Sequence, residues 1–504
     1  MQTNQEPVAP ACALVIFGAS GDLTKRLLLP AVYNLVTYGL LSRDSVIVGV
    51  ARREMDDASF RQQMQTAVSE LGTQVLNPKV WEDFGNRIYY CRGEFDDPNT
   101  FVRLKERLAD LDQTHHLNGN YLFYLATQES SFAPIVESLG QAGLVEESHG
   151  WKRVIVEKPF GRDLASSREL SKRLAAVLGE QQIYRIDHYL GKETVQNLLV
   201  LRFCNSLFEP TWSRTFIDHV QITVAESLGV EERGAFYETA GALRDVMENH
   251  MFVLLALFCM EPPSSLRGDP VRNEMVKVIQ SIQHFHSLDQ ILENSCRGQY
   301  SGGEIDGRKI PAYRSANRVA PDSNVETYAA LRLKVANWRW AGVPFYLRTG
   351  KALAKKATEI VVQFKQPPLK LLQTNGAGSA DPNRMILHIQ PRQGITTEFQ
   401  AKLPGTGIRT KEVSLNFDYK EFGDVPRAVG YETLLYDAMI GDNTLFHRTD
   451  MVDAAWQVAT PVLDAWANNP PKDFPNYQPG SQGPACADGL LQRDGRSWWI
   501  PGQQ

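Results

Sequence analysis

The chain has 504 residues, of which 43% are hydrophobic and 22% are charged, and its formal net charge at pH 7 is −5. This length predicts two or more domains, because single hydrophobic cores stop growing at roughly 250–300 residues. The acidic balance excludes a nucleic-acid partner held by bulk electrostatics, so any phosphate site must be local.

The sequence has no features of a membrane span or a signal peptide. Its longest apolar run, residues 251–260, is too short to cross a bilayer, and residues 1–10 are polar and contain prolines. The cysteines form no C-x-x-C pair and no metal-like cluster, which predicts reduced thiols in a cytoplasmic protein without a metal site. They are Cys12, Cys91, Cys204, Cys259, Cys296 and Cys486.

The N-terminal region begins with a continuous apolar run, Ala13–Phe17, which is typical of a buried parallel strand. A turn containing two glycines, residues 18–23, follows at once, and a helical pattern starts at Thr24. This order is typical of a dinucleotide-binding βαβ unit, in which glycines let backbone N–H groups approach a pyrophosphate. Ser20 and Leu23 occupy two glycine-type positions of the G-x-G-x-x-G pattern, so a purely structural turn is an alternative.

A second strand pattern, residues 45–50, ends in Ala51, Arg52 and Arg53. In NAD-preferring domains an acidic residue near this point binds the ribose hydroxyls, whereas an arginine suits a 2′-phosphate. The pair therefore predicts NADP as the cofactor, with a solvated charge pair at a loop start as the alternative.

Further strand patterns at residues 87–92, 120–126 and 153–157 alternate with helical patterns. Such alternation predicts a doubly wound parallel sheet with helices on both faces, which is an α/β, Rossmann-type domain. Lys158 follows the last of these strands, at the sheet edge where ligands of such domains bind. An ordinary loop lysine would also fit this position.

Residues 185–193 combine an acid, a histidine, a phenol, a glycine and a lysine in one short block. A helical pattern over residues 194–203 follows, so His188 and Lys192 stand at the mouth of a helix. Helix N-termini offer free N–H groups and a positive dipole end, and Lys192 adds a full charge. The block predicts an anion pocket, and the alternative is a helix-entry loop with its charges facing water.

Beyond residue 205 the pattern changes to a period of two, at residues 219–225 and again at 330–336, and residues 359–364 are a third strand candidate. We predict an α+β domain with a large, mainly antiparallel sheet over residues 206–504. It would follow a dinucleotide-binding domain over residues 11–205 and a flexible tail over residues 1–10.

A helical pattern that starts at Ala242 carries Asp245 and His250. Five positions apart, they would lie roughly 140° apart around a regular α-helix and so not on one face. Apolar residues follow His250, which makes a core histidine the plain alternative to a catalytic one. Lys351 and Lys356 suit a phosphorylated or acidic substrate, or are surface charges. The remaining histidines considered are interpreted as structural: His219, His388 and His447.

Several segments together resemble the glucose-6-phosphate dehydrogenase family. They occur in the family's order, they span nearly the whole chain, and the block at residues 185–193 is the most specific of them. The matching segments are residues 17–23, 157–161, 185–193, 241–243 with Asn249 and His250, 343–351 and 480–484.

This resemblance implies oxidation of glucose 6-phosphate at C1 to the 6-phosphogluconolactone, with hydride transfer to NADP, by a homodimer or homotetramer. His250 would be the general base, and Asp187 the carboxylate that orients it and stabilises its protonated form. His188, Tyr189 and Lys192 match the residues that hold the 6-phosphate.

The resemblance also implies the remaining contacts of the site. The implied substrate contacts are Lys158, Glu226, Asp245, Lys351 and Lys356. The implied cofactor contacts are Gly18, Ser20, Gly21, Asp22, Leu23, Lys158 and Arg52, with Arg52 on the 2′-phosphate.

Two other functions are alternatives at this point. A sugar oxidoreductase of the Gfo/Idh/MocA type shares the Glu-Lys-Pro motif at residues 157–159 but lacks the phosphate trio. A catalytically silent sugar-phosphate or NADP-binding protein has no need of His250. The sequence departs from the family at Gln128 and Glu129, where many members have two prolines, which affects the expected loop near the nicotinamide.

Overall fold

The computed structural model describes residues 6–369, 381–423 and 430–502. The chain divides into two compact units, each assembled from three stretches, whereas the sequence predicted contiguous domains. The predicted limits, 11–205 and 206–504, stay a prediction, and residues 1–5 of the predicted tail lie outside the described residues. Unit 1 comprises Met1–Glu193, Pro263–Asn273 and Pro426–Asp453, and unit 2 comprises Thr194–Pro262, Glu274–Val425 and Ala454–Gln504.

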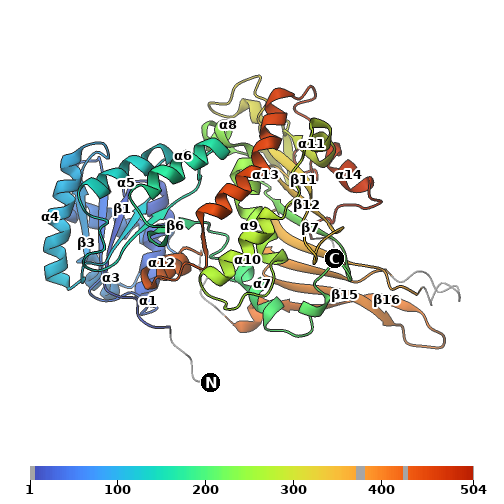
Figure 1. Ribbon diagram of the computed structural model, residues 1–504, viewed down its shortest axis with the longest axis horizontal. Coiled ribbons are helices and arrows are strands. Elements are labelled where there is room, and N and C mark those ends of the chain that lie inside the picture. Colours follow the sequence, from blue (N-terminus) through green and yellow to red (C-terminus); the bar gives the residue numbers. More distant parts are fainter. Residues whose placement is uncertain (1–5, 370–380, 424–429, 503–504) are drawn as a thin grey trace. The chain divides into compact units, whose positions relative to one another are not determined.

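Unit 1 is built around a seven-stranded sheet with the order β17-β6-β5-β4-β1-β2-β3, labelled in part in Figure 1. Strands β1 to β6 pair in parallel, and β17 joins the edge antiparallel to β6. The predicted parallel sheet is therefore confirmed. Its strands are β1 (Ala13–Phe17), β2 (Val46–Ala51), β3 (Ile88–Arg92), β4 (Tyr121–Leu125), β5 (Lys152–Val156), β6 (Ile183–Ile186) and β17 (Phe446–His447).

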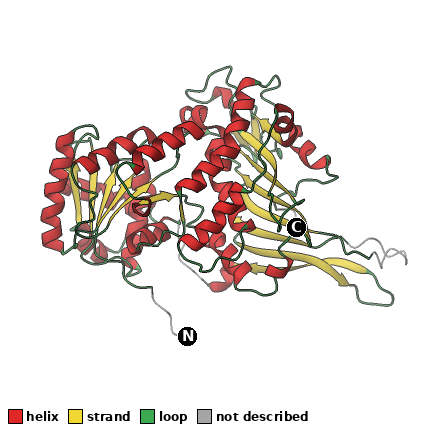
Figure 2. Ribbon diagram, viewed as in Figure 1, coloured by secondary structure: helices red, strands yellow, loops and turns green. Residues whose placement is uncertain are grey.

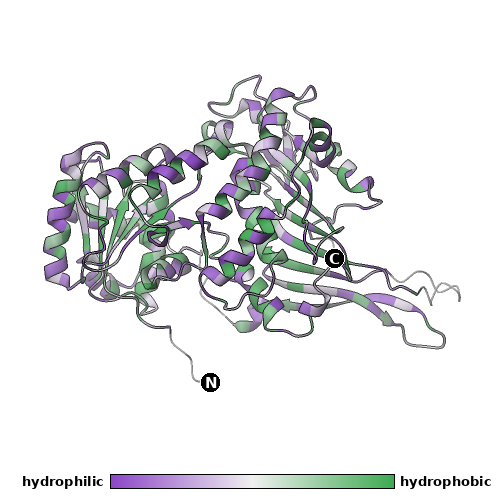
Figure 3. Ribbon diagram, in the orientation of Figure 1, coloured by the Kyte–Doolittle hydropathy of each residue, from purple (hydrophilic) through white to green (hydrophobic). Residues whose placement is uncertain are grey.

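The central strands of this sheet are buried along their whole length, which explains their unbroken apolar sequences. Figure 3 shows these apolar residues concentrated along the strands, and Figure 2 shows the helices around them. Strand β1 lies between β2 and β4, so the strand order reverses there and leaves a crevice at the carboxyl ends. The helices of unit 1 are η1 (Thr24–Leu28), α1 (Leu29–Thr37), α2 (Asp57–Leu71), α3 (Pro78–Gly85), α4 (Pro98–His115), η2 (Glu129–Ser131), α5 (Phe132–Gln141), α6 (Leu164–Ala175), η3 (Glu180–Gln182) and α12 (Tyr431–Ile440).

Unit 2 is built around an eight-stranded sheet with the order β16-β15-β14-β13-β7-β12-β11-β8. Strands β7 and β12 pair in parallel and the other neighbours pair antiparallel, so the predicted mainly antiparallel sheet is confirmed. Its strands are β7 (Ile217–Ala225), β8 (Ser295–Gly298), β11 (Tyr328–Lys334), β12 (Pro344–Gly350), β13 (Ala357–Phe364), β14 (Arg384–Gln390), β15 (Gly394–Lys402) and β16 (Thr410–Asp418), and a separate hairpin joins β9 (Gly303–Ile305) to β10 (Arg308–Ile310).

One helical segment packs on strands β7, β11 and β12 of this sheet. It begins as the π-helix η6 (Leu243–Met251) and continues as α9 (Phe252–Cys259), in which every residue is buried. Among the described residues, no helix is long and apolar enough to cross a membrane. The other helices that lie wholly or partly in unit 2 are α7 (Glu193–Phe203), η4 (Glu209–Thr211), η5 (Glu231–Arg233), α8 (Gly234–Ala242), α10 (Asp269–Gln280), α11 (Leu288–Asn294), η7 (Tyr313–Ser315), η9 (Tyr419–Phe422), α13 (Thr449–Asn468) and α14 (Ala485–Gln492).

The prediction of reduced thiols was wrong for two of the six cysteines. Cys296 on β8 and Cys486 on α14 form a disulfide across a sequence separation of 190 residues. Their Cα atoms lie 5.8 Å apart, a spacing that the tertiary structure sets and that no local cysteine pattern reveals.

Candidate functional site

The glycine turn at residues 18–23 lies at the carboxyl end of β1, in the crevice where the strand order reverses. Gly18 has a φ of +84°, and a Cβ at this position would collide with the carbonyl oxygen of Ala126, just beyond β4. The backbone N–H groups of Gly18 and Ala19 donate to the carbonyl oxygen of Val50 in β2. Glycine is thus required for the turn to sit between these two strands.

A helix starts directly after this turn and runs through η1 into α1. A helix N-terminus at a glycine turn is a favourable place for a pyrophosphate, because it presents N–H groups and the positive end of the helix dipole. Arg52 follows β2 at the same edge of the sheet, and its side chain is 74% exposed, with its Nε 3.8 Å from Oε2 of Glu94. These residues fit a dinucleotide that carries a 2′-phosphate.

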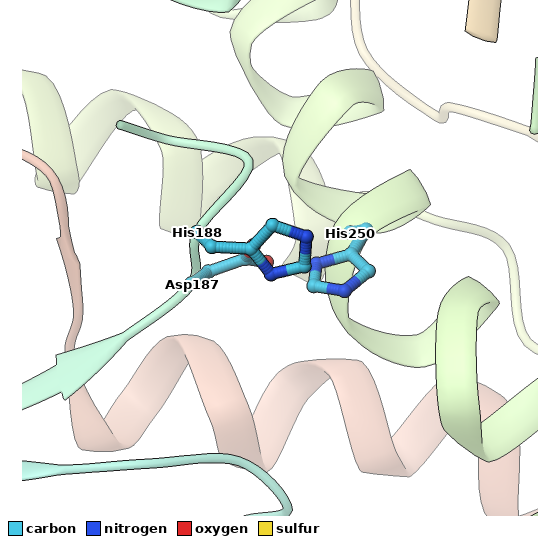
Figure 4. A group of neighbouring side chains, drawn as sticks. All are labelled: Asp187, His188 and His250. Atoms are coloured by element: carbon cyan, nitrogen blue, oxygen red, sulfur yellow. The ribbon is translucent and has the colours of Figure 1, made fainter. Parts of the chain in front are cut away.

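The loop between β6 and α7 carries Asp187, His188, Tyr189 and Lys192. Two successive backbone hydrogen bonds fold it, from Leu190 N–H to the Asp187 carbonyl (3.0 Å) and from Lys192 N–H to the Tyr189 carbonyl (3.1 Å). The Asp187 carboxylate is only 2% exposed, and its Oδ1 accepts a hydrogen bond from the Tyr189 N–H at 2.8 Å. Figure 4 shows Asp187 and His188 on this loop, after the end of β6.

The predicted phosphate trio is brought together by this fold. The rings of His188 and Tyr189 have centroids 5.1 Å apart, and Nζ of Lys192 lies 5.3 Å from the Tyr189 ring centroid. Gly191 packs so closely on Gly430, at the start of α12, that a Cβ would collide with the carbonyl oxygen of Gly430. One cation, one imidazole and one phenol thus gather directly before the N-terminus of α7.

A second polar group forms in unit 2, where the carboxyl ends of the parallel strands β7 and β12 meet. The strands place Ala225 opposite Gly350, so the residues that follow them, Glu226 and Lys351, become neighbours. Nζ of Lys351 lies 2.7 Å from Oε1 of Glu226 and 3.9 Å from Oδ2 of Asp245 on η6. Three of the predicted substrate residues therefore form one charged cluster around a buried lysine.

Comparisons with known proteins cover nearly the whole chain. Residues 15–197 match the family described as glucose-6-phosphate dehydrogenase, NAD binding domain, and residues 199–499 match glucose-6-phosphate dehydrogenase, C-terminal domain. The chain is 46% identical to glucose-6-phosphate 1-dehydrogenase of Aggregatibacter actinomycetemcomitans over 98% of both chains. It is 41% identical to the enzyme of Bacillus subtilis over 99% of this chain and 100% of that protein.

The chain belongs to the glucose-6-phosphate dehydrogenase family.

Solved structures of the family agree with the fold. A glucose-6-phosphate dehydrogenase in complex with glucose 6-phosphate superposes with a TM-score of 0.88 at 32% identity, over 98% of this chain and 100% of that one. The enzyme from Mycobacterium avium gives a TM-score of 0.83 at 35% identity, over 98% of this chain and 99% of that one. The chain is accordingly an oxidoreductase that oxidises glucose 6-phosphate with NADP as the acceptor, and the Gfo/Idh/MocA alternative is not favoured.

The helix that carries Asp245 and His250 corrects one prediction. It is a π-helix over Leu243–Met251, and a π-helix makes i→i+5 hydrogen bonds. Residues five apart therefore lie on successive turns near one face, whereas the predicted 140° separation assumed an α-helix. Both side chains belong to buried residues, and Figure 4 shows His250 on this helix.

Lys356 does not join the cluster around Lys351. It is exposed and lines a cavity of about 320 Å³ together with residues of β13, β14 and the C-terminal segment. Neither Lys351 nor Glu226 lines this cavity. The role of Lys356 in substrate binding stays a prediction.

Two neighbours of the predicted residues were missed in the sequence. Glu157 directly precedes Lys158 in the sequence. Its Oε1 accepts hydrogen bonds from the Tyr124 hydroxyl at 2.5 Å and from the Tyr431 hydroxyl at 3.2 Å. Burial raises the pKa of Glu157 above its ordinary value, and these two hydrogen bonds oppose that shift. Tyr431 lies 274 residues beyond Glu157, so no local pattern connects them.

Tyr237 on α8 is the corresponding neighbour in unit 2. Nζ of Lys351 lies 5.6 Å from the centroid of its ring. Burial, followed by the negative charges of Asp245 and Glu226, raises the pKa of the Tyr237 hydroxyl well above its ordinary value. A protonated phenol therefore borders the charged cluster.

The three histidines interpreted as structural each face a carboxylate in their own unit. Nδ1 of His219 lies 2.7 Å from Oδ2 of Asp218, and Nδ1 of His388 lies 3.0 Å from Oε1 of Glu359. Nε2 of His447 lies 3.4 Å from Oδ2 of Asp187, one of the two predicted catalytic residues.

Proposed function

We propose that His250 is the general base that removes the proton of the C1 hydroxyl of glucose 6-phosphate. Oxidation of this hemiacetal to a lactone releases one proton and one hydride, and bound NADP supplies the hydride acceptor. An imidazole titrates near neutral pH, which suits a proton acceptor, and a paired carboxylate increases its basicity. Asp187 is the proposed carboxylate, which orients His250 and stabilises the imidazolium.

We further propose that His188, Tyr189 and Lys192 bind the 6-phosphate. A phosphate dianion needs several donors, and the trio supplies an imidazole, a hydroxyl and an ammonium on one folded loop. Binding energy from this remote group then helps to position the reacting end of the sugar. The folded loop with Asp187 and the trio on six consecutive residues is the observation that carries the proposal.

The remaining substrate contacts are assigned to charged residues at strand ends. Glu226, Asp245 and Lys351 form a cluster that offers both acceptors and a donor to sugar hydroxyls. Lys158 follows β5 at the edge of the sheet where ligands of such domains bind, and it is proposed to contact both sugar and cofactor. Lys356 is proposed as a further substrate contact on the resemblance alone.

The cofactor is assigned to the turn at the carboxyl end of β1 and to the end of β2. Gly18 permits the turn, and the helix N-terminus after it is suited to the pyrophosphate. Arg52 is proposed to bind the 2′-phosphate. The turn residues assigned to the cofactor are Gly18, Ser20, Gly21, Asp22 and Leu23.

An activity matrix of sugars against NADP and NAD tests the overall proposal. Glucose 6-phosphate with NADP should give the strongest growth of NADPH absorbance, and no growth with any hexose phosphate would refute the activity. His250→Asn should lower kcat by roughly 10²–10⁴-fold while calorimetry still detects sugar binding. His284→Asn, at an exposed histidine of the same unit, is the control and should leave kcat unchanged.

The 2′-phosphate assignment has its own test. Arg52→Ala should lower the ratio of kcat/KM for NADP to that for NAD by about tenfold or more, because a charge-assisted hydrogen bond is lost. Arg168→Ala removes another exposed arginine, which pairs with Asp453, and it should leave the ratio unchanged. An unchanged ratio in Arg52→Ala would refute the assignment.

We also propose a homodimer or homotetramer in the cytoplasm. The edge strand β16 is nine residues long and carries the exposed side chain of Leu415, with Ile408 and Phe422 exposed nearby. Exposed edge strands with apolar side chains favour association. Light scattering coupled to size exclusion measures the state directly, and a monomer at micromolar concentration would contradict the proposal.

A further inference from the structure

Asp187 is contacted by a histidine from its own unit. Nε2 of His447 lies 3.4 Å from Oδ2 of Asp187, and both residues are at most 5% exposed. The other oxygen, Oδ1, accepts the backbone N–H of Tyr189 at 2.8 Å. The carboxylate is thus contacted at both oxygens by groups of unit 1.

The backbone holds His447 firmly in this position. Strand β17 adds to the edge of the parallel sheet, with Phe446 opposite Ile186 and His447 opposite Arg185. Two residues further on, the N–H and the hydroxyl of Thr449 donate to the Glu180 carboxylate at 3.0 and 2.7 Å. This carboxylate also pairs with Arg185 at 2.8 Å. The position of β17 is therefore fixed both by its pairing with β6 and by the hydrogen bonds of Thr449 directly after it.

The imidazole ring is packed as well as hydrogen bonded. The ring of Phe160, which belongs to the Glu157–Gly161 segment after β5, has its centroid 5.8 Å from that of His447. The contact with this ring and the pairing of β17 both restrict the orientation of the His447 side chain.

The chemistry of the contact fixes which atom carries the proton. An ionised carboxylate has only acceptors, so Nε2 of His447 must be the donor. A hydrogen bond to the charged form favours that form and restricts its rotation. Oδ2 would thereby stay correctly oriented through the reaction.

We propose that His447 is a positioning residue, whose Nε2–H holds the Asp187 carboxylate in the orientation that serves the base. This inference rests on the proposed roles of Asp187 and His250. It adds a residue that lies 260 positions beyond Asp187 in sequence, on a strand of only two residues.

Variants of His447 test the proposal through kcat. His447→Leu removes the donor and should lower kcat with glucose 6-phosphate and NADP about tenfold, the effect expected from one lost hydrogen bond. Both KM values should stay within about twofold, because the residue is not proposed to touch substrate or cofactor. His447→Gln retains an N–H donor and should recover most of the lost kcat.

His219 offers a matched control in the same molecule. It is also a buried histidine bonded to a carboxylate, it lies on β7, and it is not among the residues assigned to the site. His219→Leu should lower the melting temperature without changing kcat. A fall in kcat equal to that of His447→Leu would identify the effect as a general loss of packing and overturn the proposal.

A double-mutant cycle connects the effect to Asp187. In the Asp187→Asn background, His447→Leu should cause no further fall in the residual kcat, because the contact is already altered. Full additivity would overturn the proposal, and so would wild-type kcat in His447→Leu. If His447→Leu does not fold, His447→Phe removes the donor with an aromatic ring of similar shape and is held to the same outcomes.

Failure of this inference differs from failure of the proposed function. Turnover that survives in His250→Asn would refute the role of the base itself. Wild-type kcat in His447→Leu, together with an inactive His250→Asn, would refute only the positioning role.

Discussion

The polar residues of the two units are assembled in different ways. In unit 1, Asp187 and the phosphate trio are consecutive or nearly so on one loop, and backbone turns fold them together. In unit 2, Glu226, Asp245 and Lys351 come from the end of one strand, a π-helix and the end of another strand. The first arrangement depends on a short local sequence, whereas the second depends on the register of β7 against β12 and on the packing of η6.

The two arrangements also differ in what balances the charges. The Asp187 carboxylate is met by a backbone N–H and an imidazole, so hydrogen bonds stabilise it. Lys351 is 7% exposed and is met by the carboxylate of Glu226, so an ion pair offsets the loss of hydration. We therefore expect changes in the loop to affect turnover and affinity, and changes in the cluster to affect stability as well.

The largest difference between the two units is expected from a pair of matched aspartate variants. Asp187→Asn should lower kcat roughly 10²–10³-fold, because the base loses its paired carboxylate, while KM for the sugar changes little. Asp245→Asn should chiefly raise KM, since it removes an acceptor from the substrate cluster. Steady-state kinetics distinguishes the effect on kcat from the effect on KM. Equal losses of kcat in the two variants would contradict the assignment of turnover to the loop and of affinity to the cluster.

The disulfide provides the next largest effect, confined to unit 2. Cys486→Ser should lower the free energy of unfolding by about 2–4 kcal/mol, because a crosslink over a long loop restricts the unfolded chain. Denaturant unfolding of oxidised wild type and the variant measures this. The affinity of unit 1 for NADP should not change, and Cys204→Ser, at an exposed free thiol, is the control.

Lysine variants compare the loop with the cluster directly. Lys351→Met leaves the Glu226 carboxylate without its cation and should lower the free energy of unfolding by about 1–3 kcal/mol. This loss is smaller than for a fully buried ion pair, because Glu226 is 37% exposed and solvent screens its charge. Lys192→Met should instead raise KM for glucose 6-phosphate with little change in stability. Thermal melts and kinetics of both variants test the contrast, and a stability loss in Lys192→Met alone would reverse it.

The smallest expected effect is a pH dependence in unit 1. Burial, followed by the charges of Asp442 and Glu6, raises the pKa of Asp437 from 3.8 to about 8. The folded state thus favours the protonated form of Asp437. The stability that this protonated carboxyl contributes is complete below about pH 4 and is lost as the pH rises through about 8. Asp437→Asn should gain melting temperature relative to wild type at about pH 9 and not at about pH 4. Equal shifts at both values would contradict the assignment.

Much of unit 1 was predictable because its signals are local. Unbroken apolar runs such as Ala13–Phe17 specify buried parallel strands, and their alternation with helices specifies the sheet. The loop that carries His188 and Lys192 was identified for the same reason, since its residues are close in sequence.

Features that depend on distant contacts were not predictable. The disulfide joins cysteines 190 residues apart, and Tyr431 and His447 reach Glu157 and Asp187 from a segment far downstream. The ion pair of Glu226 with Lys351 depends on a parallel pairing within an otherwise antiparallel sheet. The π-helix was missed because hydrophobic periodicity over nine residues does not distinguish 3.6 residues per turn from a wider helix.

The π-helical conformation of Leu243–Met251 is a functional property in itself. In an α-helix of unchanged length each residue is turned about 100° from the last, so Asp245 and His250 would lie about 140° apart and face different directions even though neither had been substituted. Deleting one residue between them and restoring α geometry would leave them four positions apart, about 40° around the helix, and so near one face again. The helix type and the number of residues between the two side chains are therefore constrained together.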